Sequence, residues 1–366
     1  MIYLSIAGTR PQLIKASVIS TAFSFVLNQN SQHHLIDTSQ HYDDSLSDFF
    51  KKQLFPENDQ DKIRTLSLKF NSELDFIASC LSQLEFQIKQ IQPSIIIAYG
   101  DTNSTICACL VANKLKIPLA HVEAGVRDRA HIRPEEMNRL IADTMSDVLF
   151  APTITAFKNA EAEFSGSYSK EICFSGDVMR DLYMNNRNKF VKTILGFEIE
   201  SKFVLVTLHR QENVDNKVYL TNIISSLNNL ASEIQIIFPI HPRTLKMIKT
   251  FGIKMDFSAC NPQDYFSFQW LIENSLYVIT DSGGLQKDAS FAGKRSLVIY
   301  QGETGWTELV ENGFLDILDP SDPNLEYKML NFDCDSNINM ESLDEVFGDG
   351  RAGEKIVKKL VTYCNK

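Results

Sequence analysis

Short apolar runs alternate along the whole chain with longer stretches in which apolar residues recur at helical spacing. The runs in the first half are IYLSIAG, HHLIDT, SIIIAYG, PLAHVEA, DVLFAP and EICFSG, and those in the second half are FVLVTLH, IQIIFPI, LYVITD and RSLVIY. Strands that are apolar along their whole length, separated by helices, are typical of parallel sheets covered on both faces. The pattern therefore predicts an α/β protein with doubly wound parallel sheets.

The length of the chain and one break in this pattern predict two domains. A chain of 366 residues is too long for one ordinary core. Residues 179–202 lack a strand and carry mixed charge, so we interpret them as the connection. We expect a Rossmann-like domain over residues 1–180, a second over 200–348, and a helix in 349–366 that returns to the first domain. Because such sheets bind ligands at the carboxyl ends of their strands, we also expect a cleft between the domains.

The composition excludes several classes of protein. A formal charge of −10 argues against nucleic acid or an anionic membrane as partner. The start MIYLSIAGTRPQLIK has too short an apolar run for a signal peptide or a membrane span. The seven cysteines are scattered without a CxxC pair, which favours reduced thiols in a cytoplasmic protein and requires neither disulfides nor zinc.

Two strand ends carry groups suited to an anion. In DSGGLQKDASFAG a strand runs through Ser282, Gly283 and Gly284 directly into a helix, whose first N–H groups make a natural anion site. Arg10 follows the first strand within GTRP, and Lys15 lies about one helical turn further on. Both suit a phosphate, although Lys15 taken alone reads equally well as surface charge.

Carboxylates follow two further strands of the first half. Asp101 follows SIIIAYG, where it can also be an ordinary helix N-cap. Period-two alternation predicts His121 and Glu123 on the same side of the next strand, and an apolar buried strand does not carry a carboxylate without a reason. A metal site at this HxE pair is disfavoured, because one histidine and one glutamate are too few ligands.

The segment RPEEMNRLIADTMSD predicts an amphipathic helix. Its spacing predicts one buried stripe, formed by Met137, Leu140, Ile141 and Thr144. The opposite, polar face carries Glu135, Asn138 and Arg139. A plain ion pair between Glu135 and Arg139 is the alternative to a functional role for these residues.

The strands FVLVTLH and IIFPI end in His209 and His241, which are either ligand-binding or structural. Carboxylates on one side and histidines with a glycine-rich helix start on the other suit proton transfer and a departing phosphate. The chain lacks GxSxG, HExxH, kinase and P-loop signatures, and no GxGxxG follows the first strand. A dinucleotide cofactor is therefore disfavoured.

The chain resembles the bacterial non-hydrolysing UDP-N-acetylglucosamine 2-epimerases over nearly its whole length. The shared motifs, in order, are GTRPQLIKA, DTSQHYDD, YGDTNST, HVEAG, RPEEMNR, SGDVM, LVTLHRQEN, PIHPR, PQDYFSF, DSGGLQKDA and GDGRAGEKI. The resemblance implies a fold like that of GT-B glycosyltransferases and inversion of carbon 2 of a UDP-linked 2-acetamido sugar, without metal or cofactor, for surface polysaccharide synthesis. It also implies a homodimer.

The resemblance assigns roles to individual residues. The family's acid/base carboxylates match Asp101, Glu123 and Glu135, and its catalytic histidine matches His209. Substrate contacts match Arg10 and Lys15, the uracil pocket matches Gln263 and Phe268, and the diphosphate cradle matches Ser282, Gly283 and Gly284. Asp288 stands where the family has a glutamate that binds the ribose hydroxyls.

Two departures from the family pattern bear on specificity and regulation. Trp306 falls where the family has an arginine that touches substrate. A tryptophan there, together with the motifs GTRPQ, GDVM and GLQK, resembles the subgroup that acts on UDP-2,3-diacetamido-2,3-dideoxyglucuronate. Both that sugar and UDP-N-acetylglucosamine stay candidate substrates. Residues matching a second, activating UDP-sugar site are Gln40, Glu136, Arg210 and His241. Asp43 replaces a glutamine expected there and would repel a diphosphate, so we expect no strong activation.

Three alternatives stay open at this point. In a hydrolysing 2-epimerase, water captures the glycal and releases UDP and free sugar. A GT-B glycosyltransferase shares the fold and the diphosphate cradle, but it has little use for three carboxylates. A non-catalytic UDP-sugar sensor would explain the altered loop around Trp306, but not the retention of His209 and the carboxylates.

Overall fold

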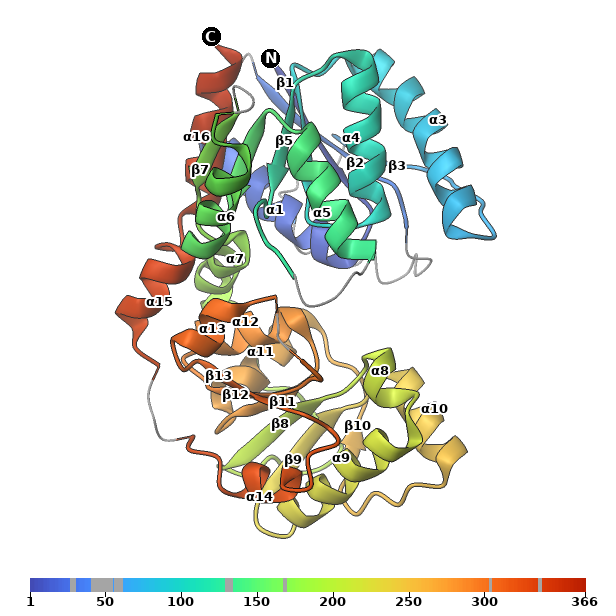
Figure 1. Cartoon of the computed structure of the whole chain (residues 1–366), viewed down its shortest axis with the longest axis vertical. Helices are drawn as coiled ribbons and strands as arrows, with labels where there is room; N and C mark the ends of the chain where they lie inside the picture. The colour runs from blue at the N-terminus through green and yellow to red at the C-terminus, as the bar shows by residue number, and fades with distance from the viewer. Residues whose placement is uncertain are drawn as a thin grey trace. The chain divides into compact units, whose positions relative to one another are not determined.

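The computed structural model describes residues 1–26, 31–40, 55, 62–128, 134–166, 170–302, 305–334 and 338–366. The chain forms two compact units, Met1–Met184 with Asp344–Lys366, and Asn185–Leu343 (Figure 1). The sequence analysis assigned residues 344–348 to the second domain, and the structure groups them with the first unit.

A seven-stranded sheet in the order β3-β2-β1-β4-β5-β6-β7 forms the centre of the first unit. All of its strand pairs are parallel. Its strands are β1 (Ile2–Ala7), β2 (Gln32–Asp37), β3 (Ile63–Thr65), β4 (Ile95–Tyr99), β5 (Leu119–Val122), β6 (Val148–Ala151) and β7 (Glu171–Phe174). The strand order reverses between β1 and β4, where an open parallel sheet places its ligands.

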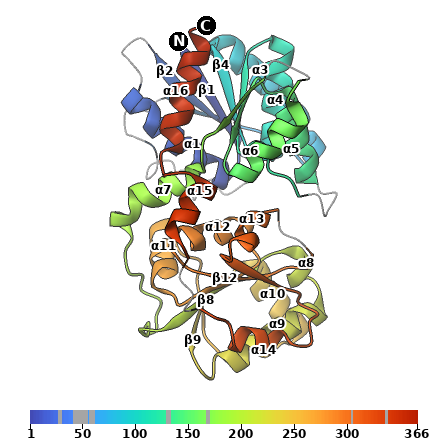
Figure 2. The ribbon, with the colours of Figure 1, turned by 60° about the vertical axis from the view of Figure 1, so that its left-hand side comes forward.

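Helices cover both faces of this sheet (Figures 1 and 2). They are α1 (Arg10–Val26), α3 (Glu73–Ile91), α4 (Asn103–Leu115), α5 (Pro134–Met145), α6 (Ile154–Phe164), α7 (Val178–Asn186) and α16 (Ala352–Cys364), while α15 (Met340–Phe347) leads back into the unit. Helix α16 packs on α1, although they lie at opposite ends of the chain (Figure 2). Asp181 of α7 accepts hydrogen bonds from the backbone N–H groups of Ala352 (2.9 Å) and Gly353 (2.7 Å), and so caps the start of α16.

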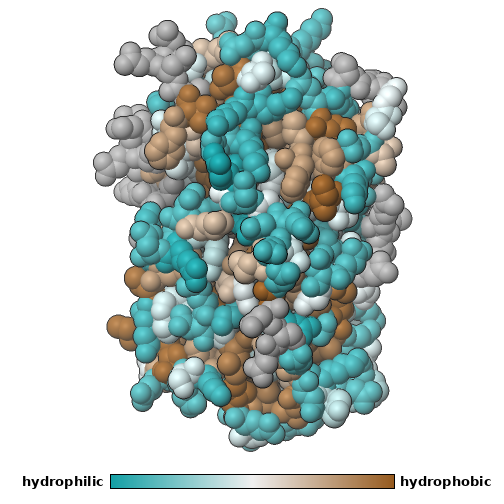
Figure 3. Space-filling view, turned by 90° about the vertical axis from the view of Figure 1, so that its left-hand side faces the viewer, coloured by the Kyte–Doolittle hydropathy of each residue, from teal (hydrophilic) through white to brown (hydrophobic). Residues whose placement is uncertain are grey.

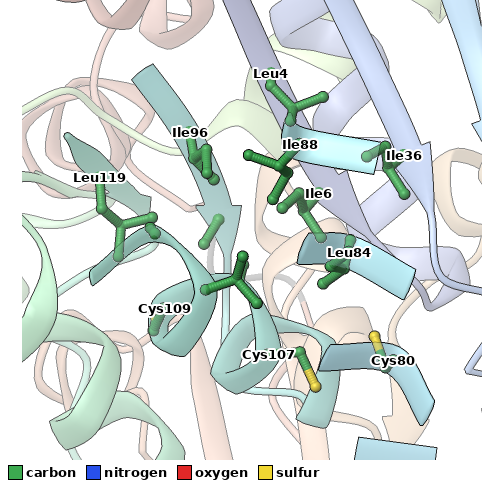
Figure 4. Close-up of a cluster of buried hydrophobic side chains, with 14 of the residues drawn as sticks. Leu4, Ile6, Ile36, Cys80, Leu84, Ile88, Ile96, Cys107, Cys109 and Leu119 are labelled. Atoms are coloured by element: carbon green, nitrogen blue, oxygen red, sulfur yellow. The ribbon is translucent and has the colours of Figure 1, made fainter. Parts of the chain in front are cut away.

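The core between the sheet and helices α3 and α4 is apolar throughout (Figure 4). Leu4 and Ile6 of β1 meet Leu84 and Ile88 of α3 there, and all four side chains are fully buried or nearly so. Cys107 of α4 belongs to the same cluster and packs as a small apolar side chain. This packing fixes the strands whose carboxyl ends carry the candidate site.

The second unit repeats the architecture on a six-stranded parallel sheet in the order β10-β9-β8-β11-β12-β13. Its strands are β8 (Phe203–Thr207), β9 (Gln235–Pro239), β10 (Ala259–Cys260), β11 (Val278–Thr280), β12 (Ser296–Ile299) and β13 (Leu315–Leu318). Its helices are α8 (Gln211–Val214), α9 (Lys217–Leu230), α10 (Pro242–Phe251), α11 (Tyr265–Asn274), α12 (Gly283–Phe291), α13 (Thr307–Glu311) and α14 (Leu325–Leu330). The predicted fold class, two doubly wound parallel α/β domains, is confirmed.

The structure also corrects the sequence analysis in its element assignments. The short strands β3, β10 and β13 were not among the predicted strands. The helices α14 and α15 were not predicted either. Strand β13 lies at the sheet edge and exposes Asp316, so it lacks the continuous apolar pattern of the inner strands.

The predicted buried stripe of α5 is wrong in part. Met137 is 50% exposed and Thr144 is exposed, while the buried residues of the helix are Ala142 and Asp143. A hydrophobic pattern cannot find this face, because one of its two buried side chains is a carboxylate paired with His121.

Polar side chains dominate the face shown in Figure 3, with apolar ones in scattered groups. In the part of the chain that the structure describes, no helix has the length and apolar character needed to cross a membrane.

Candidate active site

In the first unit, the turns after β1, β2 and β4 pack closely against one another. A side chain at Gly8 would collide with the hydroxyls of Thr38 and Ser104, so only glycine fits at this turn. Those hydroxyls hydrogen-bond to each other (2.7 Å), and Gln40 accepts from both the backbone N–H (3.1 Å) and the hydroxyl (2.8 Å) of Ser104. Gln40 thus lies at the start of α4, beside the turn that carries Arg10, which is exposed.

Gln12 holds these turns together, and the sequence analysis did not single it out. Its Oε1 accepts from the backbone N–H groups of Gly8 (2.9 Å) and Thr9 (3.2 Å). Its Nε2 donates to the carbonyl of Tyr99 (2.6 Å) and to the Thr105 hydroxyl (2.9 Å). A buried glutamine that makes four bonds fixes the end of β1 against the end of β4.

Glu123 forms an ion pair with Lys15, and their side chains are 16% and 12% exposed. The prediction that His121 and Glu123 share one side of a strand is wrong, because β5 ends at Val122 and Glu123 has a left-handed φ of 77°. His121 points into the core instead, against Asp143. The structure therefore pairs the carboxylate of Glu123 with a lysine from the first helix.

Asp101 forms an ion pair with Arg139 of α5. Arg139 also donates to Glu136 (3.0 Å), and Asn138 donates to the backbone carbonyl of Asp101 (2.8 Å). The suggested pair between Glu135 and Arg139 is not the one formed, since Arg139 bonds Asp101 and the neighbouring Glu136. Glu135 lies exposed in the first turn of α5. The structure thus brings together Asp101, Glu136 and Arg139.

In the second unit, Asp281 organises the loop that carries His209. This carboxylate is fully buried at the end of β11 and accepts from the backbone N–H groups of His209 (3.0 Å) and Arg210 (2.9 Å). It also lies 3.3 Å from Nδ1 of the His209 ring and accepts from Asn213 (3.3 Å). Sequence reasoning missed Asp281 as a functional residue, although a carboxylate directly after an apolar strand was a usable signal.

Donor groups surround the first turn of α12. Ser282 is its N-cap, and a Cβ atom on Gly283 would lie 3.6 Å from Nη2 of Arg210 and 3.9 Å from Nε1 of Trp306. The Arg210 guanidinium stacks over the ring of Tyr300 at 4.6 Å. Its Nη1 is buried and, among the described residues, has no hydrogen-bond partner. The turn is therefore flanked by N–H donors that suit an anion.

Lys287, another residue that the sequence analysis did not assign, lies on α12 behind this turn. It is 3% exposed, and its Nζ lies 4.1 Å from the centre of the Trp306 ring. A cation held this closely over an indole face orients the ring. Trp306 therefore presents its N–H beside Gly283 with Lys287 supporting it from the ring face.

The two strand-end histidines of this unit lie together, with ring centres 6.1 Å apart. His241 is the N-cap of α10, and its Nδ1 accepts from the backbone N–H of Arg243 (3.2 Å). Desolvation, followed by the charges of His209 and Arg243, lowers the pKa of His241. His241 is therefore a neutral hydrogen-bonding group at neutral pH.

The remaining candidates of the second unit lie around α11. Gln263 accepts from the Thr193 hydroxyl (2.5 Å), and Phe268 is half-buried against the core. Asp288 of α12 accepts from Gln269 of α11 (3.3 Å). Asp43, on which the expectation of weak activation depends, lies outside the described residues.

Comparisons with known proteins agree on one family. A family profile described as UDP-N-acetylglucosamine 2-epimerase matches residues 26–361. The chain is 38% identical over 312 residues to the UDP-2,3-diacetamido-2,3-dideoxy-D-glucuronate 2-epimerase of Pseudomonas aeruginosa, covering 85% of this chain and 86% of that protein. It is 32% identical over 372 residues to the UDP-N-acetylglucosamine 2-epimerase of Methanocaldococcus jannaschii, covering 98% of each. The crystal structure of UDP-GlcNAc 2-epimerase from M. jannaschii with UDP-GlcNAc and UDP has a TM-score of 0.80 at 31% identity, covering 99% of this chain and 100% of that chain.

Proposed function

The chain belongs to the UDP-N-acetylglucosamine 2-epimerase family and is a UDP-sugar 2-epimerase, and we propose that its substrate is UDP-2,3-diacetamido-2,3-dideoxyglucuronate. The reaction inverts carbon 2 of a UDP-linked 2-acetamido sugar. The observation that carries the choice of sugar is the indole of Trp306, supported by Lys287 beside the glycine-rich turn, where the family has an arginine. The identity to the Pseudomonas aeruginosa enzyme supports the same choice.

The chemistry of carbon 2 determines what the residues must do. The proton on this carbon has no adjacent carbonyl, so simple removal and return of the proton is implausible. In the proposed route a base removes this proton, the bond between carbon 1 and the UDP oxygen breaks, and UDP departs. The sugar that remains is a 2-acetamidoglycal. A proton then adds to carbon 2 from the opposite face, and UDP oxygen bonds carbon 1 again. The route requires carboxylates at carbon 2 and stabilisation of the departing diphosphate.

The proposed acid and base groups are carboxylates of the first unit. Glu123, Asp101 and Glu135 are the candidates for proton transfer at carbon 2. Lys15 supports Glu123 in this role, because the ion pair fixes the direction of the carboxylate. Arg10 is proposed to contact the substrate phosphates.

The proposed nucleotide groups belong to the second unit. Ser282, Gly283 and Gly284 hold the diphosphate at the start of α12, and the indole N–H of Trp306 contributes a further donor. His209, oriented by Asp281, stabilises the departing UDP. Contacts to uracil come from Gln263 and Phe268, and a contact to the ribose comes from Asp288.

Proton NMR of the enzyme in deuterated water tests this proposal, with UDP-N-acetylglucosamine and UDP-2,3-diacetamido-2,3-dideoxyglucuronate supplied separately. We expect deuterium at carbon 2 of the diacetamido sugar and the appearance of a second UDP-sugar. Exchange with UDP-N-acetylglucosamine alone contradicts the choice of sugar. Release of UDP and free sugar makes the enzyme a hydrolysing 2-epimerase. Binding without exchange favours the non-catalytic sensor, and transfer to an acceptor that persists in Glu123→Ala favours a glycosyltransferase.

A second UDP-sugar site is proposed at Gln40, Glu136, Arg210 and His241, with weak activation at most. Gln40 and Glu136 already bond backbone N–H groups of Ser104 and Asp128, which supports a mainly structural role for both. Hyperbolic initial rates without an added activator are the expected result. Sigmoidal rates that a second UDP-sugar abolishes would contradict it.

The cellular setting is proposed from the family resemblance. The enzyme acts as a homodimer in the cytoplasm and supplies a sugar for surface polysaccharide such as O-antigen or capsule. Light scattering of the purified protein checks the oligomeric state, and a monomeric mass at micromolar concentration would contradict the dimer.

A further inference from the structure

His121 is a fully buried histidine that the proposed mechanism does not use. It lies on β5, and its Nδ1 is 2.6 Å from Oδ1 of Asp143 on α5. Its Nε2 is 2.8 Å from the carbonyl oxygen of Gly100, the residue before Asp101. Both ring nitrogens therefore have a hydrogen-bond partner, and each partner is an oxygen atom.

The nature of these partners determines where the protons are. A carbonyl oxygen only accepts, so Nε2 carries a hydrogen. Asp143 is an ionised carboxylate, since its Oδ2 also accepts from the backbone N–H of Gly125 (3.0 Å) and pairs with Arg127 (2.8 Å). Although desolvation opposes this, the contacts with His121 and Arg127 lower the pKa of Asp143. The proton between Nδ1 and Oδ1 consequently lies on the nitrogen.

We infer that His121 donates hydrogen bonds from both ring nitrogens, as an imidazolium, and that it positions the two loops that carry Asp101 and Glu123. The charges of the network are balanced, with His121, Asp143 and Arg127 buried and Glu163 at the surface. Arg127 donates from Nε to Glu163 (3.0 Å). Positive and negative charges therefore alternate along the contacts that join His121, Asp143, Arg127 and Glu163. A buried charge of either sign is tolerated only when it is paired in this way.

The network fixes the backbone on both sides of the carboxylates. A Cβ atom on Gly100 would lie 3.6 Å from both Oε2 of Glu123 and Nζ of Lys15, so this residue borders their ion pair. Gly125, which donates to Asp143, follows Glu123 by two residues. Glu123 has a left-handed φ of 77°, a conformation that costs free energy for a residue with a side chain. The network stabilises this conformation, because it holds the backbone of Gly100 and of Gly125.

The other titratable or charged groups around the network do not compete for the proton. Cys109 of α4 is a neutral thiol, because desolvation and the charge of Asp143 raise its pKa to about 12. Lys170 donates to the backbone carbonyl of Asp143 (2.9 Å), and not to its carboxylate. The charge of His121 is therefore decided by the carbonyl of Gly100 and the carboxylate of Asp143.

Nitrogen NMR of the intact enzyme with ¹⁵N-labelled histidine tests the charge directly. The signals of His121 are identified by their loss in His121→Gln. We expect both ring nitrogens to carry a bonded hydrogen at pH 7. One unprotonated ring nitrogen at that pH overturns the inference. This experiment needs no folded variant beyond the one used for assignment, and it does not depend on the proposed function.

Asp143→Asn tests the positioning role, which rests on the proposed roles of Asp101 and Glu123. We expect His121 to lose one ring proton and kcat to fall by roughly 10²-fold, the cost typical of a small misplacement of catalytic groups, with a smaller change in KM. Glu163→Gln is the matched control, because it removes a charge from the same network and leaves both acceptors of His121 in place. We expect kcat within about 3-fold of the unmodified enzyme, the spread of context effects expected away from the reacting groups.

Equal losses of kcat in the two variants, or unchanged kcat in Asp143→Asn, overturn the positioning role. An unmodified enzyme that is inactive on both UDP-sugars but has a doubly protonated His121 overturns the proposed function and leaves the imidazolium standing. The two failures are therefore distinguishable.

Discussion

At the scale of single residues, three candidate groups are each held by a charged partner. Glu123 has Lys15, Asp101 has Arg139, and His209 has the buried Asp281. A carboxylate paired with a cation is fixed in position and direction, which suits a group that must face one carbon atom of the substrate. Glu135 is exposed, so its candidacy depends on its motif alone.

Replacing Glu123 by glutamine tests the proposed base. The amide has nearly the same shape but cannot accept the proton, so we expect kcat to fall by about 10²–10⁴-fold, the range for loss of a general acid or base. Deuterium incorporation at carbon 2 measures the loss directly. Glu161→Gln, an exposed glutamate on α6, is the matched control and is expected to leave the rate unchanged. A Glu123→Gln variant with normal exchange would assign proton transfer to another carboxylate.

Replacing Trp306 by arginine tests the proposed source of specificity. The guanidinium restores the residue type of the family pattern, but it also places a cation next to Lys287, so the orienting contact is lost. We expect the ratio of kcat/KM for UDP-N-acetylglucosamine over the diacetamido sugar to rise by about 10-fold, equivalent to about 1.4 kcal/mol. The two substrates are compared in competition by NMR. A ratio that stays constant while both rates fall would mean that Trp306 has no part in discrimination.

At the scale of elements, helix α5 carries the cluster around Asp101 and has a capped end. Lys170, which precedes β7, donates to the backbone carbonyls of Asp143 (2.9 Å), Thr144 (2.7 Å) and Ser146 (2.5 Å). The last carbonyls of a helix lack partners within the helix, and a cation there also interacts favourably with the helix dipole. Lys170 thereby anchors the end of α5 to the beginning of β7.

We expect Lys170→Met to lower the free energy of unfolding by about 2 kcal/mol, the scale of hydrogen bonds to a charged group. Methionine keeps most of the apolar stem, so the loss reports the ammonium group. Urea unfolding followed by far-UV circular dichroism measures it, and Lys158→Met on the exposed face of α6 serves as the comparison. Equal urea midpoints for Lys170→Met and Lys158→Met would show that the three carbonyl groups bonded by Lys170 find other hydrogen-bond donors.

At the scale of the whole molecule, the first unit is completed by the last helix of the chain, α16. Asp181 of α7 bonds the N-terminus of α16 across a sequence separation of 171 residues. Ile356, Val357 and Leu360 of α16 are fully buried. The last helix is therefore part of the core that supports the candidate site.

The charge of Asp181 makes this closure sensitive to pH. Burial raises its pKa from 3.8 to about 6, so the folded chain binds this proton more tightly than the unfolded chain. The contribution of this one group to stability is then fully present below pH 3.8 and is lost as the pH rises through about 6, by at most about 3 kcal/mol. An asparagine side chain does not titrate. We therefore expect the free energy of unfolding of Asp181→Asn to rise relative to that of the unmodified protein as the pH increases from 4 to 6. Urea unfolding of both proteins at several pH values measures the difference. A difference that does not vary with pH contradicts the raised pKa.

The sequence by itself determined the fold class and most of the strands, because apolar strands buried on both faces leave a continuous pattern such as SIIIAYG. It also determined the positions of Asp101, His209 and the Ser282–Gly284 turn, since parallel strands bring their carboxyl ends to one edge of a sheet. It did not predict β3, β10 and β13, which are too short or too polar at the sheet edges to leave such a pattern.

Only the tertiary structure decided which groups are paired. Lys15 and Glu123 are separated by 108 residues, and His121 and Asp143 by 22, so no local spacing indicates either contact. The left-handed φ of Glu123 redirected a side chain that strand alternation had placed beside His121. The physical reason is common to these cases. Pattern and propensity are local, whereas the partner of a buried charge is chosen by whichever element packs against it.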